Sequence, residues 1–388
     1  MDPSDIFQIY SSDLHADSYS GGNYRLSDRD RRFGYIFNKL KGEYNKSSKP
    51  RGFLFNAQNS KIALLTAKEV LVKILFAGGL YEIIFKLRPS RVLQENVKQF
   101  KPDKILAFGY SIGQCLLTLS LHKIFGIKYI VVSTDDWASY LHKSSRGAYK
   151  LQETLFAKYF SNIIFDFYNK AESVYVFNDR MARVYECKYK TKVHSFYHTT
   201  DLAFLHAPDH IFNKKLSFAI IGSFNTERYQ SLVRFIEAMS HLPDVELHIY
   251  SVNCELLGST LRGCRGVFIY DDPGDDLLIF QLRKHDFMVI IETFDDVYAG
   301  TIEFSISSKC HIFMRTAKPI FVFGHSQCGT VEYASKDGWA KVFNDFNHMD
   351  IQSHINKLIY DEEYYFESVN KAKQTLIKNH DRKNHIVL

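Results

Sequence analysis

The sequence has little proline, tryptophan and cysteine for its length. Its 388 residues include 8 prolines, 2 tryptophans and 6 cysteines. None of the cysteines belongs to a Cys-x-x-Cys pair, which argues against a disulfide framework or a zinc site and predicts reduced, buried thiols. Because the chain is poor in proline and rich in phenylalanine and tyrosine (32 and 24 residues), we expect compact domains with few long linkers.

No charge of one sign dominates the sequence. The 49 lysines and arginines exceed the 43 acidic residues by only +6, which is too little for the basic face of a dedicated nucleic-acid binder. With 46% hydrophobic and 24% charged residues, the composition excludes disorder, collagen and coiled coil. At roughly 100–200 residues per domain, the length predicts two or three domains.

Long hydrophobic runs are also missing. The longest uncharged stretch, residues 105–121, is too short and too polar to span a bilayer. The first five residues are acidic and lead directly into a strand pattern, so the sequence gives no sign of a signal peptide. We therefore predict a soluble, cytoplasmic protein.

Short β-rich runs alternate with helical patterns along the whole chain. Strands are predicted in the first half at residues 6–10, 52–55, 104–108, 128–133, 174–177 and 193–196. In the second half they are predicted at residues 217–221, 246–250, 267–270, 287–291 and 320–323. Helical patterns fill the intervals, and the main ones cover residues 67–88, 111–125, 151–170 and 362–379. One more helix would place Leu232, Phe235, Ile236 and Met239 on a single face.

This alternation predicts an α/β protein with two doubly wound, Rossmann-like domains that face each other across a cleft. Periodicity is lost over residues 199–215, which we interpret as a hinge. We predict an N-terminal domain of residues 1–205 and a C-terminal domain of residues 206–364. Ligands of such sheets bind beyond the carboxyl ends of the strands.

Two strand-to-helix loops have residues suited to an anionic ligand. Gly21 and Gly22 follow the first predicted strand, and glycines there let backbone N–H groups approach a phosphate. Gly222 and Ser223 follow the strand that opens the second half, and Arg228 lies on the next helix, where a guanidinium could pair with a phosphate. Ordinary loops and a capped helix with a surface arginine remain open as alternatives.

The most informative segment is residues 301–320, which read TIEFSISSKCHIFMRTAKPI. It resembles the segment S-I-P-S-K, followed by a hydrophobic helix and G-K-P-(I/V), of nucleotide-sugar glycosyltransferases with the GT-B fold, those related to glycosyltransferase family four (group 1). The first half agrees, because KYIVVSTDDW (128–137), AESVYVFN (171–178) and YKTKVHSFYHTTD (189–201) are similar, in order, to that family's acceptor-side strand, following strand and hinge entry.

The resemblance implies a hexosyltransferase that moves a sugar from a nucleoside-diphosphate sugar to a hydroxyl group. It implies that residues 1–205, joined by the C-terminal helix 365–388, form the acceptor-binding domain and that residues 206–364 form the nucleotide-sugar-binding domain. It implies that Ser308 and Lys309 contact the donor diphosphate. Cationic stabilisation of the leaving phosphates is the main chemical need, so neither a metal nor a cofactor is required. Asp135, at the end of a predicted strand, is the candidate general base, unless it only caps the next segment. Glu303 is the candidate contact to the donor sugar, unless it only faces solvent.

The segment also departs from the family pattern. Ile312 stands where many relatives carry the glutamate that holds the ribose, Ser307 replaces the proline, and Ala317 replaces a glycine. A catalytically silent partner subunit is therefore one alternative. A second is an α/β-hydrolase, because residues 109–113 read GYSIG, a nucleophile-elbow pattern that would make Ser111 the nucleophile of an esterase.

The expected partners follow from the same resemblance. They are a nucleotide-sugar donor and a glycan or lipid-linked glycan acceptor of surface polysaccharide biosynthesis, with no nucleic acid. The basic, apolar helix predicted at residues 67–88 permits peripheral contact with the inner face of a membrane, or else packs in the first domain. Asp28 and Asp30 form an Asp-x-Asp pattern among arginines. We interpret this pattern as a solvated charged face rather than a metal site.

Overall fold

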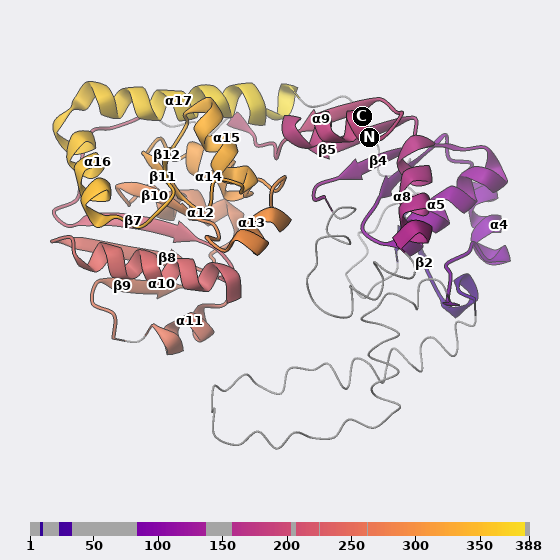
Figure 1. The fold of residues 1–388 in the computed structure, drawn as a ribbon, viewed down its shortest axis with the longest axis horizontal. Coiled ribbons are helices and arrows are strands. Elements are labelled where there is room, and N and C mark those ends of the chain that lie inside the picture. Colours follow the sequence, from indigo (N-terminus) through magenta and orange to yellow (C-terminus); the bar gives the residue numbers. More distant parts are fainter. Residues whose placement is uncertain are drawn as a thin grey trace, which may run out of the picture. The chain divides into compact units, whose positions relative to one another are not determined.

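The computed structural model describes residues 8–10, 23–32, 84–136, 157–202, 207–224, 226–261 and 263–384 (Figure 1). By contact, the chain forms two compact units. The first comprises residues 1–133, 137–176 and 182–194, and the second comprises residues 134–136, 177–181 and 195–388. The predicted division after residue 205, and the predicted return of residues 365–388 to the N-terminal domain, stay predictions.

The first unit is built on a sheet of four strands with the order β3-β4-β5-β6, and its β3, β4 and β5 run parallel. A short parallel pair, β1 with β2, lies apart from that sheet. The strands are β1 (Gln8–Tyr10), β2 (Asn23–Arg25), β3 (Lys104–Phe108), β4 (Lys128–Ser133), β5 (Ser173–Phe177) and β6 (Val193–Phe196). The helices are η2 (Asp28–Asp30), α4 (Arg91–Phe100), α5 (Ile112–Phe125), α8 (Ala157–Asn169) and α9 (Asp179–Lys188), whose first three residues belong by contact to the second unit.

Local sequence signals explain where these helices begin and end. The Ser90 hydroxyl accepts a hydrogen bond from the backbone N–H of Leu93 and so caps α4. Gly126 ends α5 with φ of 69°, a left-handed conformation that favours glycine. Of residues 84–88 only Ile84 is helical, and Leu87 forms an antiparallel bridge with Arg31. The rest of the predicted helix 67–88, and the predicted strand 52–55, lie outside the described residues.

The sequence predicted a solvated charged face at the start of the chain, and this is correct for Arg25, Arg29 and Arg32, which are exposed, but wrong for Asp30. Asp30 is fully buried, and its carboxylate accepts hydrogen bonds from the Tyr24 hydroxyl and from the backbone N–H groups of Ser27 and Ser90. A buried carboxylate is stable only when it is hydrogen-bonded in this way. Asp30 therefore ties the β2 segment to the start of α4. Among the described residues, no group of His, Cys, Asp and Glu side chains is placed to hold a metal ion.

The second unit contains a sheet of six parallel strands with the order β12-β11-β10-β7-β8-β9. Its strands are β7 (Leu216–Ile221), β8 (Val245–Tyr250), β9 (Val267–Tyr270), β10 (Phe287–Ile291), β11 (Ile320–Phe323) and β12 (Lys341–Phe343). The chain first adds β8 and β9 on one side of β7 and then returns to place β10 on the other side. This reversal is the topological switch point of a doubly wound sheet, and it confirms the predicted fold class.

Helices connect these strands in the expected alternation. They are α10 (Thr226–Ser240), α11 (Cys254–Thr260), α12 (Asp275–Leu282), α13 (Asp296–Thr301), α14 (Lys309–Met314), α15 (Gly329–Asp337), α16 (His348–Tyr360), α17 (Glu362–His380) and η4 (Arg382–Asn384). Figure 1 shows α17 as a long helix along one side of the second unit. No helix in the described part of the chain is both long and apolar enough to cross a membrane.

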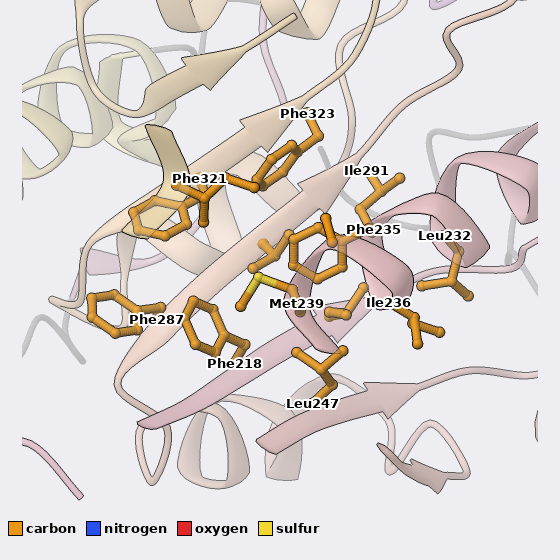
Figure 2. Close-up of a cluster of buried hydrophobic side chains, with 14 of the residues drawn as sticks. Phe218, Leu232, Phe235, Ile236, Met239, Leu247, Phe287, Ile291, Phe321 and Phe323 are labelled. Carbon is orange, nitrogen blue, oxygen red and sulfur yellow. The ribbon is translucent and has the colours of Figure 1, made fainter. Parts of the chain in front are cut away.

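Aromatic side chains form much of the core of this unit. Phe218, Phe287 and Phe321 stack across adjacent strands with ring centroids 4.8 and 5.3 Å apart. Figure 2 shows how Phe235 and Met239 of α10 point at this sheet surface. All four residues predicted to share one face of that helix are buried. Much of the aromatic excess in the sequence is therefore core packing, which aromatic rings stabilise through their large buried area.

Candidate functional site

The site lies at the carboxyl ends of β7 and β10, the two strands that flank the switch point. Gly222 and Ser223 directly follow β7, and Glu292 directly follows β10. A Cβ on Gly222 would lie only 3.1 Å from the ring of Phe224, so this loop approaches its own side chains closely. Open parallel sheets bind ligands at this position because the diverging loops leave a crevice there.

Arg228 and Glu292 form an ion pair at this end of the sheet. Arg228 lies on α10, and its Nη2 is 2.8 Å from Oε2 of Glu292, whose side chain is only 3% exposed. The other carboxylate oxygen, Oε1, accepts a hydrogen bond from the hydroxyl of Thr330 at 2.9 Å. The buried carboxylate therefore fixes the arginine on one side and the first turn of α15 on the other.

Lys309 brings a second cation to the same place. It is the first residue of α14, and its pKa is lowered by burial and by the charge of Arg228, while Glu292 and Asp272 act in the opposite direction. Two cations thus interact around one buried carboxylate, whereas the second acidic residue that acts on Lys309, Asp272, is exposed, so that its charge is screened by solvent. Such an arrangement leaves positive charge that a bound anion can neutralise.

The loop before α14 is held by hydroxyl groups. The Thr330 hydroxyl accepts a hydrogen bond from the backbone N–H of Ser307 at 2.9 Å, and the Ser308 hydroxyl lies 3.3 Å from the ammonium of Lys309. A Cβ on Gly329 would lie 2.6 Å from the carbonyl oxygen of Ser305, so only glycine allows α15 to begin this close to the loop. We refer to Arg228, Glu292, Ser307, Ser308, Lys309 and Thr330 as the donor cluster.

Asp135 belongs by contact to the second unit, together with Thr134 and Asp136. Its carboxylate accepts a hydrogen bond from the hydroxyl of Ser305 at 2.7 Å. Near it lies His198, whose pKa is lowered by burial and by the charge of Lys309 and raised in part by Asp135. His198 is therefore neutral near pH 7 and lies within electrostatic range of both a predicted donor contact and the predicted base.

Glu303 is not a solvent-facing side chain but part of an ion-pair network within the second unit. The Arg180 guanidinium lies 2.5 Å from its carboxylate, pairs with Glu332, and sits 5.5 Å from the ring centre of Phe304. Asn178 donates a hydrogen bond from its side-chain amide to the carbonyl of Phe304. The start of α9 thus holds the 303–304 loop, and Arg180 fixes the direction of the Glu303 side chain.

Sequence reasoning found some members of this arrangement and missed others. Gly222, Ser223, Arg228, Ser308 and Lys309 meet around the switch point, whereas Gly21 and Gly22 lie outside the described residues. The sequence interpretation missed Glu292, Thr330, His198 and Arg180. A signal existed for Glu292, because it directly follows a fully buried strand, but the identity of its partners depends on strand order.

The serine of the GYSIG pattern has a different role from a nucleophile. The Ser111 hydroxyl accepts a hydrogen bond from the backbone N–H of Gln114 at 3.1 Å and caps α5. Its φ of −155° and ψ of 154° are ordinary extended values, whereas a nucleophile elbow is a strained turn. The side chain of Gln114 accepts a hydrogen bond from the backbone N–H of Tyr110. This geometry favours a cap over an esterase nucleophile.

No protein-family model matches the chain, and no curated protein matches its sequence. Solved structures do match its fold. Sucrose-phosphate synthase from Thermosynechococcus elongatus superposes with a TM-score of 0.54 over 97% of this chain and 95% of that chain, at 8% identity. A glycosyltransferase from Rickettsia africae gives 0.52 over 97% and 96%, at 11% identity. The chain has the GT-B fold.

HepE from Anabaena, solved in complex with UDP-glucose, has the same GT-B fold. Its TM-score is 0.52 over 78% of this chain and 80% of that chain, at 12% identity. These likenesses confirm the predicted GT-B architecture, in which the two parallel sheets described above are the Rossmann-like sheets. Within it, the donor cluster lies at the switch point of the six-stranded sheet, where a doubly wound domain binds its ligand.

Proposed function

We propose that the chain is a glycosyltransferase that uses a nucleoside-diphosphate sugar as donor. The convergence of Arg228 and Lys309 beside the buried Glu292, at the switch point of the six-stranded sheet, carries this proposal. A diphosphate placed there would neutralise the two cations and favour the charged form of Lys309. As the sugar leaves, negative charge grows on the phosphate oxygens, and prearranged cations stabilise that charge without a metal.

The remaining predicted residues have roles in the same reaction. The acceptor oxygen forms a bond to the anomeric carbon while the bond from that carbon to the phosphate oxygen breaks. The acceptor hydroxyl gives up its proton, and Asp135 is our candidate to receive it. Glu303, oriented by Arg180, is our candidate for hydrogen bonds to the donor sugar. Gly222 and Ser223 would let the loop after β7 approach the donor phosphates closely.

We further propose a hexose as the transferred sugar and a glycan or glycolipid of surface polysaccharide biosynthesis as the acceptor. The reaction would take place in the cytoplasm, at or near the inner face of the membrane. HepE, with the same fold, has been solved with UDP-glucose and with UDP and glucose. Those ligands belong to that protein, but they support the choice of a nucleotide sugar as the first donor to test.

A panel of nucleotides tests the donor. The melting temperature of the purified protein is measured with UDP, GDP, ADP, CMP and dTDP, because a ligand that binds the folded state raises it in proportion to its affinity. We expect one of the five to raise it clearly, and Lys309→Ala to abolish the rise. Lys371→Ala, on the exposed side of α17, serves as the matched control. No response to any nucleotide, or an undiminished response of Lys309→Ala, would refute the proposal.

One observation favours a second candidate, a GT-B subunit that binds a donor without turning it over. Ile312, at the position where many relatives carry a glutamate, packs its side chain against the buried core of the second unit. It offers no polar atom to a ribose. Incubation of the purified chain with the nucleotide sugar whose nucleotide stabilises it separates the two candidates. Transfer to an acceptor, or slow donor hydrolysis, excludes the silent subunit.

A further inference from the structure

A groove of about 610 Å³ lies on the second unit, outside the donor cluster. It is lined by residues of β7, β8 and β9 and by the end of α12, and none of the donor-cluster residues contributes to it. It extends along the strands from the level of Glu246 to that of Tyr250, which at 3.3 Å per residue is about 13 Å. Its size is that of a typical ligand site, and its length exceeds a single small ring.

Aromatic rings form one wall of this groove. Alternate residues of a strand point to the same face of the sheet, so His248 and Tyr250 of β8 share a face with Tyr270 of β9. The rings of His248 and Tyr270 are nearly parallel, at 4°, and Tyr250 and Tyr270 stack at 23° with centroids 5.1 Å apart. Tyr270 is 40% exposed and Phe268, which stacks on His248, is 41% exposed. We call this surface the aromatic groove.

The polar groups of the aromatic groove have no excess of either charge. Its lining holds two lysines, Lys215 and Lys284, and two carboxylates, Glu246 and Asp271. Lys215 and Glu246 already form an ion pair at 3.1 Å. His285, at the base of the groove, has a pKa lowered to about 3 by burial and by the charges of His248 and Lys284, so it is neutral near pH 7. The groove therefore offers hydrogen-bond donors and acceptors without a field that would select a phosphate.

This combination excludes two classes of ligand. A wholly apolar molecule would remove water from the polar pairs Lys215–Glu246 and Lys284–Gln281 without offering them a hydrogen bond, at a cost of about 1–3 kcal/mol for each polar group left unsatisfied. A nucleotide or another phosphate would find no uncompensated cation, in contrast to the donor cluster. What fits is a neutral molecule that has flat C–H faces for the rings and many hydroxyl groups for the polar rim. Neutral hexose oligosaccharides have both.

We propose that the aromatic groove is a carbohydrate-binding site, separate from the donor cluster, that holds a segment of a neutral oligosaccharide. The sugar faces pack on the exposed ring of Tyr270, which the buried ring of Tyr250 supports from within, and the hydroxyl groups bond to Glu246, Gln281 and Lys284 along the rim. A glycan held here stays on the protein independently of whether a donor is bound. The site thus provides tethering rather than chemistry.

Calorimetric titration of the full chain with maltotetraose, cellotetraose and chitotetraose tests the groove. We expect saturable binding of at least one of them, weakened about tenfold in Tyr270→Ala because a stacked aromatic face is lost. Tyr270→Phe keeps the ring and should keep the affinity. Tyr360→Ala, which removes an 84% exposed tyrosine of α16, is the matched control and should bind as the unaltered protein does.

The outcomes also separate this site from the proposed donor site. Lys309→Ala should bind the tetrasaccharide normally even though its nucleotide response is lost, and Tyr270→Ala should respond to nucleotide normally. Absence of saturable binding for all three tetrasaccharides overturns the proposal, whatever the nucleotide panel shows. Equal affinity of Tyr270→Ala and the unaltered protein overturns it as well. If Tyr270→Ala fails to fold, a loss of binding in Gln281→Ala, which removes a hydrogen-bonding group of the rim, with retained binding in Tyr360→Ala supports the site, and retained binding in both overturns it.

Discussion

The donor cluster and the aromatic groove belong to the same six-stranded sheet but differ in how their charges are arranged. In the donor cluster, Arg228 and Lys309 share one buried carboxylate, Glu292, so positive charge is left over. In the groove, charges are balanced and the surface is aromatic. The comparison teaches that one sheet offers two kinds of binding chemistry. At the switch point the binding residues come from loops and helix starts, whereas on the β8–β9 side they come from the side chains of the strands.

The largest expected difference comes from removing one lysine in each region. Lys309→Ala should lower nucleotide affinity about a hundredfold, because truncating a charged group that contacts a desolvated phosphate costs about 2–5 kcal/mol. Lys215→Ala, in the groove, removes the same charge from an exposed pair and should leave nucleotide affinity unchanged. Calorimetric titration of both variants measures the difference. Equal nucleotide affinities of Lys309→Ala and Lys215→Ala would contradict the distinction between the two regions.

The second difference concerns carboxylates and stability. Glu292→Gln leaves two cations without their buried counter-charge, and we expect a loss of about 2 kcal/mol in the free energy of unfolding, less than for a fully buried pair because Arg228 is partly exposed. Glu246→Gln weakens a partly exposed pair with Lys215 and a 3.7 Å contact with His248, whose pKa is lowered by burial, and should cost less than about 0.5 kcal/mol. Urea unfolding of both variants measures these two losses in the free energy of unfolding. A cost for Glu246→Gln as large as that for Glu292→Gln would contradict the balanced charge assigned to the groove.

A third measurement tests what the two regions share. His311, next to Lys309, and His285, beneath the groove, both have a pKa lowered to about 3, chiefly by burial. The unfolded chain binds a proton at each below about pH 6.5 while the folded chain does not, so the free energy of unfolding falls as the pH drops from 6.5 toward 3.

Replacing either histidine with glutamine should lower the slope of the free energy of unfolding against pH by about 1.4 kcal/mol per pH unit between pH 6 and 4. This change corresponds to one proton fewer taken up on unfolding. Urea unfolding at pH 6.5, 5.5 and 4.5 measures the slope. Both variants should flatten it to the same extent. An unchanged slope in one of them would show that its histidine is accessible to protons in the folded state.

The smallest expected effect lies outside both regions and supplies a baseline. Ser111→Ala removes the cap of α5 and should cost about 1 kcal/mol of stability. It should change neither nucleotide nor tetrasaccharide binding. Labelling of the unaltered protein with a fluorophosphonate tests the esterase alternative. Modification of Ser111 would contradict its role as a helix cap and restore the esterase interpretation.

Most strands of this protein could be predicted from local pattern. Residues 104–108, 128–133, 267–270, 287–291 and 320–323 were expected as strands and form β3, β4, β9, β10 and β11 within those limits. Short apolar runs bounded by polar or glycine residues are typical of buried parallel strands. The pattern failed for β2 and β12, each of three residues, because so short a run shows no period.

Charged residues were harder to interpret than apolar ones. Asp30 was expected to face solvent and is fully buried, because Ser27 and Ser90 supply hydrogen bonds that no local pattern reveals. Glu303 was expected to be either a donor contact or a solvent-facing residue, and its pairing with Arg180 joins positions far apart in the sequence. Burial of a charge depends on its partners, and partners across elements are set by packing.

The sequence alone determined the alternation of strands and helices, the parallel sheets that this alternation requires, and the segment that carries Ser308 and Lys309. These follow from periodicity and from short-range spacing, which the chain contains before it folds. Only the tertiary structure decided that β10 returns beside β7, bringing Glu292 to Arg228, and that Tyr270 of β9 stays exposed beside His248 of β8. Strand order is a long-range property, so the charges and rings that it brings together cannot be read from any single segment.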